Sequence, residues 1–335
     1  QMEVLSSDQL IAMTTLQVAA LNTQQVASLA TDALAQLETR DLQVIRAAAI
    51  GALTTQQVAA LGTLQVSVLS SAQAAQLTTQ QMPVLGTDQL KAMTSTQVQA
   101  LNSAQVASLG TAQLPAIETT DLVVLRTSVV AALTTSLVAS LTSEQLSALT
   151  TNQLGALGTR QMLMLGTDSI AALRTEQAAA LSSTQGSVLT SDQVAALETA
   201  DLAALRTAGI AALSATSFAA LTSEQLPSLT TNQAAALTTA QVALLGSDQV
   251  ASLQTSDLVA VRSAAIATLN SAGVSALTTV QFAALRTHQV AALTTTQLPV
   301  LGTDQLAIFT SAQAAALSSL QIVALGSDQL VALGT

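Results

Sequence analysis

A single pattern of apolar and polar positions repeats every eight residues along the chain. Leu or another apolar residue stands at the first position of each unit, from residue 5 to residue 333, without insertion or deletion. The unit, which we call an octad, reads L-[T/G/N/S]-[T/S]-x-Q-[V/L/I]-A-A, as in "LTTQQVAAL" at residues 53–61. An unbroken short period is typical of repeat proteins. About 41 octads fill residues 1–335, which we therefore expect to form one continuous repeat domain.

The polar half of the octad predicts the start of a short helix. Its third position is Thr or Ser in every octad except at Ala47 and Ala215. A hydroxyl followed by a Gln, and often by an acidic residue, is typical of a helix N-cap and first turn. We therefore predict that third-position residues such as Thr55, Thr151 and Thr231 are the structural caps of the helices.

The second position predicts where each helix ends. Gly and Asn are frequent there, for example Gly62 and Asn102, and these residues tolerate the left-handed backbone found just past a helix end. Each octad is thus expected to end one helix and begin the next.

Helices this short are expected to stack. A helix of five or six residues is unstable alone, because nucleation costs more than so few hydrogen bonds return. The sixth-position aliphatic residue and the Leu of the next octad are three residues apart and share one helix face. Stacking these faces produces a continuous Leu/Val seam. The sequence predicts an all-α solenoid, a superhelix of very short helices with one helix per octad.

A β-solenoid is the alternative fold. Four octads carry Pro at the seventh position, where a short helix loses a backbone hydrogen bond: Pro83, Pro115, Pro227 and Pro299. In a β-solenoid the Thr/Ser pairs would form outward ladders, and such a flat array could bind ice. Ala and Gln are poor strand formers, however, so the helical fold is favoured.

Some departures from the octad recur after 80 residues. The block "ETRDLQVIRAAAIGAL" at residue 38 returns as "ETTDLVVLRTSVVAAL" at 118 and "ETADLAALRTAGIAAL" at 198. Either an 80-residue segment was duplicated, or ten octads complete a geometric turn. If neighbouring octads stack, the acidic and basic residues in successive octads of each block form inter-repeat ion pairs. These pairs are Glu38 with Arg46, Glu118 with Arg126, and Glu198 with Arg206.

Composition and charge exclude several partners. The formal net charge is −10, and the nine Lys and Arg residues are scattered singly, so no basic stripe is available for nucleic acid or an anionic membrane. No apolar run approaches the length that spans a bilayer, which argues against membrane insertion. The chain begins with neither Met nor a signal segment, so we expect it to be a mature chain or a piece of a longer chain.

Candidate chemistry is sparse. The single His, His288, has no second His or Cys to share a metal, and the many hydroxyls have no recurring base to activate them. We therefore expect no catalytic residues, no cofactor and no enzymatic activity. Asp88, Asp168 and Asp248, spaced by 80 residues, are weak metal-ligand candidates. Favourable charge at a helix start explains them better.

The tandem "LTTxQVAAL" pattern resembles the repeat tracts of very large secreted or surface exoproteins of Gram-negative bacteria, which are often labelled adhesin-like. The resemblance covers essentially the whole chain. It implies an extracellular or cell-surface structural role, as a filament, stalk or adhesin repeat region that associates with itself. A peptide-binding or glycan-binding solenoid, and an ice-binding Thr-ladder β-solenoid, are the alternatives.

Overall fold

The computed structural model describes residues 6–334, and all regular structure in this range is helical. It comprises 37 short α-helices and four 3-10 helices. Residues 6–334 contain no β-strand, so the predicted solenoid of short helices is confirmed and the β-solenoid alternative is wrong. The ice-binding hypothesis depended on a flat β-array of Thr side chains and fails with it. Leu5, the first seam position, lies outside the described residues.

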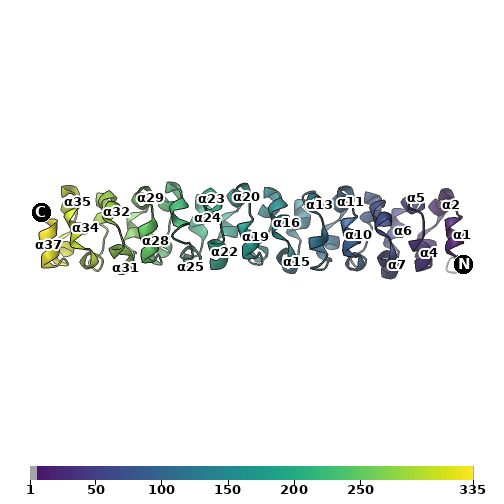
Figure 1. The fold of residues 1–335 in the computed structure, drawn as a ribbon, viewed down its shortest axis with the longest axis horizontal. Coiled ribbons are helices and arrows are strands. Elements are labelled where there is room, and N and C mark those ends of the chain that lie inside the picture. The colour runs from purple at the N-terminus through teal and green to yellow at the C-terminus, as the bar shows by residue number, and fades with distance from the viewer. Residues whose placement is uncertain (1–5, 335) are drawn as a thin grey trace. The chain divides into compact units, whose positions relative to one another are not determined.

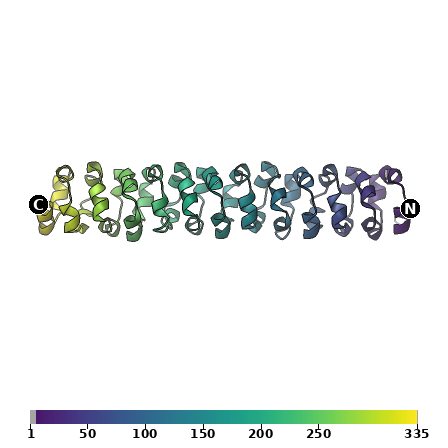
Figure 2. The ribbon, with the colours of Figure 1, turned by 45° about the horizontal axis from the view of Figure 1, so that its top comes forward.

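Contacts divide the chain into two compact units, Gln1–Leu165 (unit 1) and Gly166–Thr335 (unit 2). Within each unit, an element packs on the element three octads further along the chain. Three octads, or 24 residues, therefore complete one coil, and the elements of each unit form three stacks. In both views of either unit, the short helices follow one another in chain order (Figures 1 and 2).

Each stack in unit 1 is named after its first helix. The α1 stack contains α1 (Ser7–Ile11), α4 (Thr31–Ala35), α7 (Thr55–Ala60), η2 (Met82–Val84), α12 (Ser103–Ala107), α14 (Thr127–Ala131) and α17 (Thr151–Gly155). The α2 stack contains α2 (Thr15–Ala20), α5 (Thr39–Val44), α8 (Thr63–Ser67), α10 (Thr87–Lys91), η3 (Leu114–Ala116), α15 (Thr135–Ser140) and α18 (Thr159–Met162). The α3 stack contains α3 (Thr23–Ala27), α6 (Ala47–Gly51), α9 (Ser71–Ala74), α11 (Ser95–Ala100), α13 (Thr119–Leu122) and α16 (Ser143–Ala148).

Unit 2 repeats this arrangement. The α19 stack contains α19 (Thr167–Ala171), α22 (Ser191–Ala195), α25 (Ala215–Phe218), α27 (Thr239–Ala243), α30 (Ser263–Ile266), α33 (Thr287–Val290) and α35 (Ser311–Ala315). The α20 stack contains α20 (Thr175–Ala180), α23 (Thr199–Ala204), η4 (Leu226–Ser228), α28 (Ser247–Ser252), α31 (Ser271–Ser275), η5 (Leu298–Val300) and α36 (Ser319–Val323). The α21 stack contains α21 (Ser183–Gly186), α24 (Thr207–Ala212), α26 (Thr231–Ala235), α29 (Thr255–Ala260), α32 (Thr279–Ala284), α34 (Thr303–Ala307) and α37 (Ser327–Leu333).

The predicted apolar seam forms the core. In the octad of α7, the first-position Leu53 and the sixth-position Val58 are both buried. The chain leaves the helix at Leu61, whose extended backbone (φ −61°, ψ 133°) points it toward the next side of the coil. A helix too short to be stable alone is thus held by the seam residues of the coils on either side of it.

The turns between helices differ from the prediction. Residues 6–334 contain no residue with positive φ, so the predicted left-handed helix ends are wrong. Gly62 instead has an extended backbone (φ −70°, ψ 160°) and is the N-cap of the next helix. Asn102 is likewise an N-cap, and its side chain accepts the Gln105 N–H. Gly and Asn occur at this position because both are favourable N-caps.

The four prolines change the helix type without interrupting the coils. Each lies within one of the four 3-10 helices, as Pro83 does in η2. The ring removes one backbone donor, and the octad continues as a tighter turn. Met82 and Leu85 beside Pro83 remain buried, so the seam is preserved. Proline at the seventh position is therefore compatible with the helical solenoid.

The coil places residues that are 80 positions apart in different stacks. Ten octads equal three coils and one further octad. A residue that recurs after 80 positions therefore lies in a different stack. Asp41 and Asp121, for example, lie in the α2 and α3 stacks of unit 1. Within unit 1 these two Asp residues therefore do not line up in one stack, and duplication of a segment stays a hypothesis for the period.

Candidate functional site

The fifth-position Gln joins consecutive coils. Gln57 is 2% exposed, and its Oε1 accepts the backbone N–H of the N-cap Thr54 at 2.7 Å. Its Nε2 donates to the carbonyl oxygens of Leu29 at 2.7 Å and Ala27 at 3.2 Å, near the helix end of the preceding coil. One side chain thereby satisfies polar groups at the start of one helix and the end of another. The same bridge recurs in most octads of both units.

Four octads carry a buried Asp in place of this Gln: Asp41, Asp121, Asp201 and Asp257. The carboxylate accepts a hydrogen bond from a third-position hydroxyl in the preceding coil. The donors are Thr15 to Asp41 (2.7 Å), Ser95 to Asp121, Thr175 to Asp201, and Thr231 to Asp257 (2.9 Å). Burial raises the pKa of Asp201 and of Asp257, and the hydrogen bonds from Thr175 and Thr231 partly oppose this rise. These buried carboxyl groups are one departure from the bridging pattern.

Arg at the second position substitutes for the missing Gln in other octads. Arg206 precedes Gly209, and Arg262 precedes Ala265, at octads without a fifth-position Gln. The guanidinium group reaches the carbonyls that a Gln amide would reach. The bonds run from Arg126 to Leu101 (2.9 Å), from Arg206 to Ala179 (3.0 Å) and from Arg262 to Ala235 (3.2 Å). In the Asp257 octad, Gln254 does the same by donating to Pro227 at 2.7 Å.

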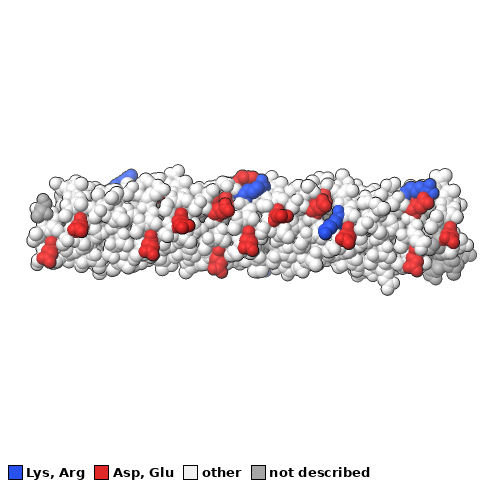
Figure 3. All heavy atoms as spheres, viewed as in Figure 1, with Lys and Arg blue, Asp and Glu red and all other residues white. Residues whose placement is uncertain are grey.

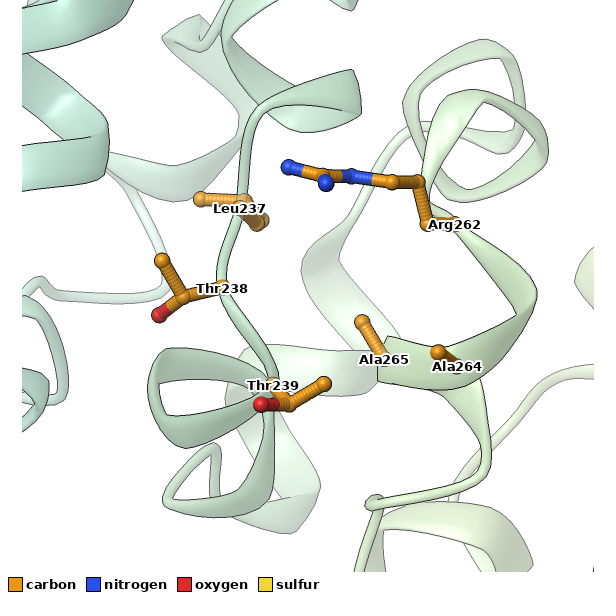
Figure 4. A pocket seen from close by; sticks show the side chains of 6 residues that line it. All are labelled: Leu237, Thr238, Thr239, Arg262, Ala264 and Ala265. Carbon is orange, nitrogen blue, oxygen red and sulfur yellow. The ribbon is translucent and has the colours of Figure 1, made fainter.

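The substitution by Arg leaves a hollow in unit 2. Figure 4 shows Arg262 extending toward the segment of Leu237, while the short side chain of Ala265 fills little of the space between coils. The hollow measures about 230 Å³. A more open hollow of about 370 Å³ in unit 1 is lined by Lys91, Glu118, Glu144 and the backbone around η3.

The helix caps lie one residue earlier than predicted. Thr54, Thr150 and Thr230 are the N-caps of α7, α17 and α26, and the side chain of each accepts the N–H of the Gln three residues later. The predicted caps are the first helical residues instead: Thr55, Thr151 and Thr231. Cap geometry requires an extended backbone, which the second-position residue has and the helical third-position residue lacks. The third-position hydroxyl is thus available to a neighbouring coil, as Thr231 shows.

The predicted inter-repeat ion pairs are not the ones that form. Successive octads lie on different sides of a coil, so Glu38 and Arg46 are not stacked. Glu38 pairs instead with Arg40 at 2.7 Å. Among the described residues, no ion pair joins Glu118 to Arg126 or Glu198 to Arg206. Arg126 and Arg206 bind backbone carbonyls, as described above.

The acidic metal-ligand candidates lie apart. Asp168 on α19 and Asp248 on α28 are the second residues of helices in different stacks of unit 2, and Asp88 occupies the same place on α10 of unit 1. Residues 6–334 contain no group of three or more His, Cys, Asp or Glu side chains that could hold a metal ion. His288 lies in the first turn of α33.

The surfaces of both units carry more acidic than basic groups. Figure 3 shows, on the face in view, separate acidic side chains with few basic ones near them. Several exposed acids occupy the fourth position, as Asp192 and Glu224 do. Across the described helices, none has the length and apolar character needed to cross a membrane.

The short helices, the three-octad coil and the bridging amides define an α-solenoid repeat protein. The ALTTAQ repeat matches seven stretches of the chain: residues 34–71, 82–116, 114–151, 138–175, 194–231, 250–287 and 283–319. Together these stretches cover well over half of the sequence, so the chain belongs to the ALTTAQ repeat family. No curated protein matches the chain.

Proposed function

We propose that this chain is a non-enzymatic structural protein, a repeat region of an extracellular or cell-surface filament, stalk or adhesin that associates with itself. The supporting observation is the equivalence of the coils. The Gln bridge that joins Gln57 to Leu29 also joins Gln153 to Leu125 and Gln281 to Leu253, with nearly the same distances. A surface that fits the next coil of its own chain also fits the same coil of a second chain.

The charge and the variable positions agree with this role. The chain carries a formal net charge of −10, which limits nucleic acid as a partner. The variable fourth position faces solvent and bears small, polar or acidic residues in most octads. We infer that the protein acts through its length and its self-association, with no cofactor and no chemistry of its own.

Sedimentation over a concentration series, together with electron microscopy of the purified chain, tests the proposal. We expect oligomers or fibres whose fraction rises with concentration. Monomers that stay dispersed at high concentration would contradict it. Replacing the exposed Leu16 and Leu64, which both lie in the α2 stack, by Lys separates lateral from coil-on-coil association. Gln24→Lys and Gln56→Lys, at equivalent exposed positions, are the matched controls.

Peptide binding is the second candidate, and the open hollow of unit 1 favours it. Lys91 and Glu144 offer both charge signs beside the backbone around Pro115. The hollow lacks an aromatic lining residue, so stacking of a sugar ring is not supported there. Pull-down with peptide libraries tests this function, and a Lys91→Glu variant should lose any ligand that uses the hollow.

A further inference from the structure

Asp201 has an unsatisfied buried carboxylate oxygen. The residue is 2% exposed, and its carboxylate accepts a hydrogen bond from the Thr175 side chain. Its Oδ2 atom is buried without a hydrogen-bond partner. A buried carboxylate oxygen without a donor is unfavourable, because the charge has lost its water and gained nothing in exchange.

The place of Asp201 in the coil makes the charged form less favourable still. A Gln at this position would donate to the carbonyls 28 and 31 residues earlier, as Gln233 does to Leu205 and Leu202. For Asp201 these residues are Leu173 and Ile170. A carboxylate offers only lone pairs at a place where the repeat uses N–H donors, whereas a neutral carboxyl group has one O–H donor.

The charges around Asp201 act in the same direction. Glu198 at the N-cap of α23 and Glu176 on α20 both raise its pKa, in addition to the larger effect of burial. Among the basic groups of the elements packed around α23, Arg174 forms an ion pair with Glu176, and Arg206 donates to a backbone carbonyl. Two further acidic groups belong to this stack: Glu224, two residues before η4, and Asp248 on α28.

We propose that Asp201 is a proton-binding site between coils: in mildly acidic solution, folded unit 2 takes up a proton on Oδ2 of Asp201. The neutral carboxyl group then acts as a donor toward the preceding coil, as the Gln amide does in other octads. Acidification therefore tightens the joint between α20 and α23. This inference is independent of self-association.

The equivalent site in unit 1 supplies an internal contrast. The Oδ2 atom of Asp41 also has no hydrogen-bond partner, but the Arg40 Nε lies 3.8 Å from it. Residue 200, which corresponds to Arg40, is Ala and is exposed. An Ala200→Arg substitution therefore places beside Asp201 the cation that lies beside Asp41.

A proton suits the site better than a metal ion. Ca²⁺ takes six to eight oxygen ligands. One oxygen of Asp201 is without a hydrogen-bond partner, and residues 6–334 contain no cluster of three or more potential metal ligands. A divalent cation is nevertheless a separable outcome of the experiment.

The test combines carboxyl ¹³C NMR with urea unfolding of the whole chain between about pH 7 and about pH 5. We expect the Asp201 signal, assigned by its loss in Asp201→Asn, to titrate above the ordinary value of about 3.9. We also expect the unfolding midpoint of unit 2 to rise on acidification. This rise should be smaller in Asp201→Asn and in Ala200→Arg, and unchanged in the exposed control Asp192→Asn.

Two results would overturn the proposal. The first is titration of the Asp201 signal at or below its ordinary value, with all variants showing the same pH dependence. The second is stabilisation of the wild-type chain, but not of Asp201→Asn, by Ca²⁺ at constant pH, which would assign the site to a cation. If Asp201→Asn does not fold, the wild-type titration and the Ala200→Arg variant still decide.

Discussion

Gln153 donates from Nε2 to the carbonyl oxygen of Leu125 at 2.8 Å, across the step from one coil to the next. Its Oε1 accepts the N–H of Thr150 at 2.9 Å within its own octad. The side chain is 2% exposed, so water cannot replace these bonds when they are lost. The amide is therefore both a helix cap and the joint between coils.

Removing this amide should weaken the solenoid more than its size suggests. Gln153→Ala leaves buried carbonyls and an N–H without partners, and we expect a loss of about 2 to 4 kcal/mol in the free energy of unfolding. Gln153→Glu should cost more near neutral pH, because a carboxylate faces carbonyl oxygens. Asn152→Ala, at the exposed neighbouring position, should stay within about 0.5 kcal/mol of wild type. Urea unfolding measures the stability of all three variants. If Gln153→Ala is as stable as wild type, the amide does not join the coils.

The position of the cap is testable with two adjacent threonines. Thr150 accepts the Gln153 N–H at 3.2 Å, and Thr151 is the first residue of α17. Thr150→Ala should cost about 1 kcal/mol of unfolding free energy, and Thr151→Ala clearly less. Thermal or urea unfolding gives the order of the two. If Thr151→Ala costs more than Thr150→Ala, the third-position residue is the cap.

The sequence predicts the helices but not the register of their caps. Two hydroxyl residues stand side by side in octads such as that of Thr150 and Thr151, and either could be the cap. The backbone decides, because the cap needs an extended conformation and the helix begins one residue later. The apolar spacing predicts the seam correctly, since Leu149 and Leu154 are buried as expected for the first and sixth positions.

The coil and the buried amides could not be predicted from the octad alone. Every octad is alike, so the sequence does not reveal that the third one along, and not the next, is the stacking partner. The pairing of Glu38 with Arg46 was wrong for this reason. Gln57 reads as a polar surface residue of a short helix, yet it is buried because all its polar atoms find partners. Its regular recurrence at the fifth position was the available signal.

The seam should be the most sensitive part of each octad. Leu157 is 2% exposed at the first position of its octad. Leu157→Ala removes a large side chain from a core of Leu, Val and Ala, and we expect a loss of about 2 to 5 kcal/mol in unfolding free energy. Ala156→Gly, at a helix end next to it, controls for backbone effects. A loss no larger than that of Thr150→Ala would mean that the caps, rather than the seam, dominate stability.

The Arg262 octad can be converted into the common pattern. Arg262→Thr alone removes the bond to Ala235 and should destabilise unit 2 by on the order of 1 kcal/mol. Adding Ala265→Gln should restore or exceed wild-type stability, because the amide reaches the same carbonyls and fills the hollow of about 230 Å³. A double-mutant cycle measures the coupling. Additive effects of the two substitutions would show that Arg262 does not replace the Gln.

Thr231 should contribute to stability in a pH-dependent way, unlike a simple cap. Its hydroxyl donates to Oδ1 of the buried Asp257 at 2.9 Å. Burial raises the pKa of Asp257, and this hydrogen bond lowers it, so Thr231→Ala should raise the pKa further. A raised folded-state pKa means that stability is lost as the pH rises through that value. The cost of Thr231→Ala should therefore be about 1 to 2 kcal/mol near neutral pH, where the carboxylate loses a donor. This cost should become smaller as the pH falls toward the ordinary Asp pKa of about 3.9.

The matched control for this substitution is Thr239→Ala. Thr239 is also the first residue of its helix, but the fifth-position residue of the octad stacked on it is Ala265 instead of an Asp. Its cost should be small and independent of pH, because no titrating group receives its hydroxyl. Urea unfolding of both variants at several pH values gives the two curves. Parallel curves would show that the Thr231 hydroxyl does not act through the Asp257 carboxyl group.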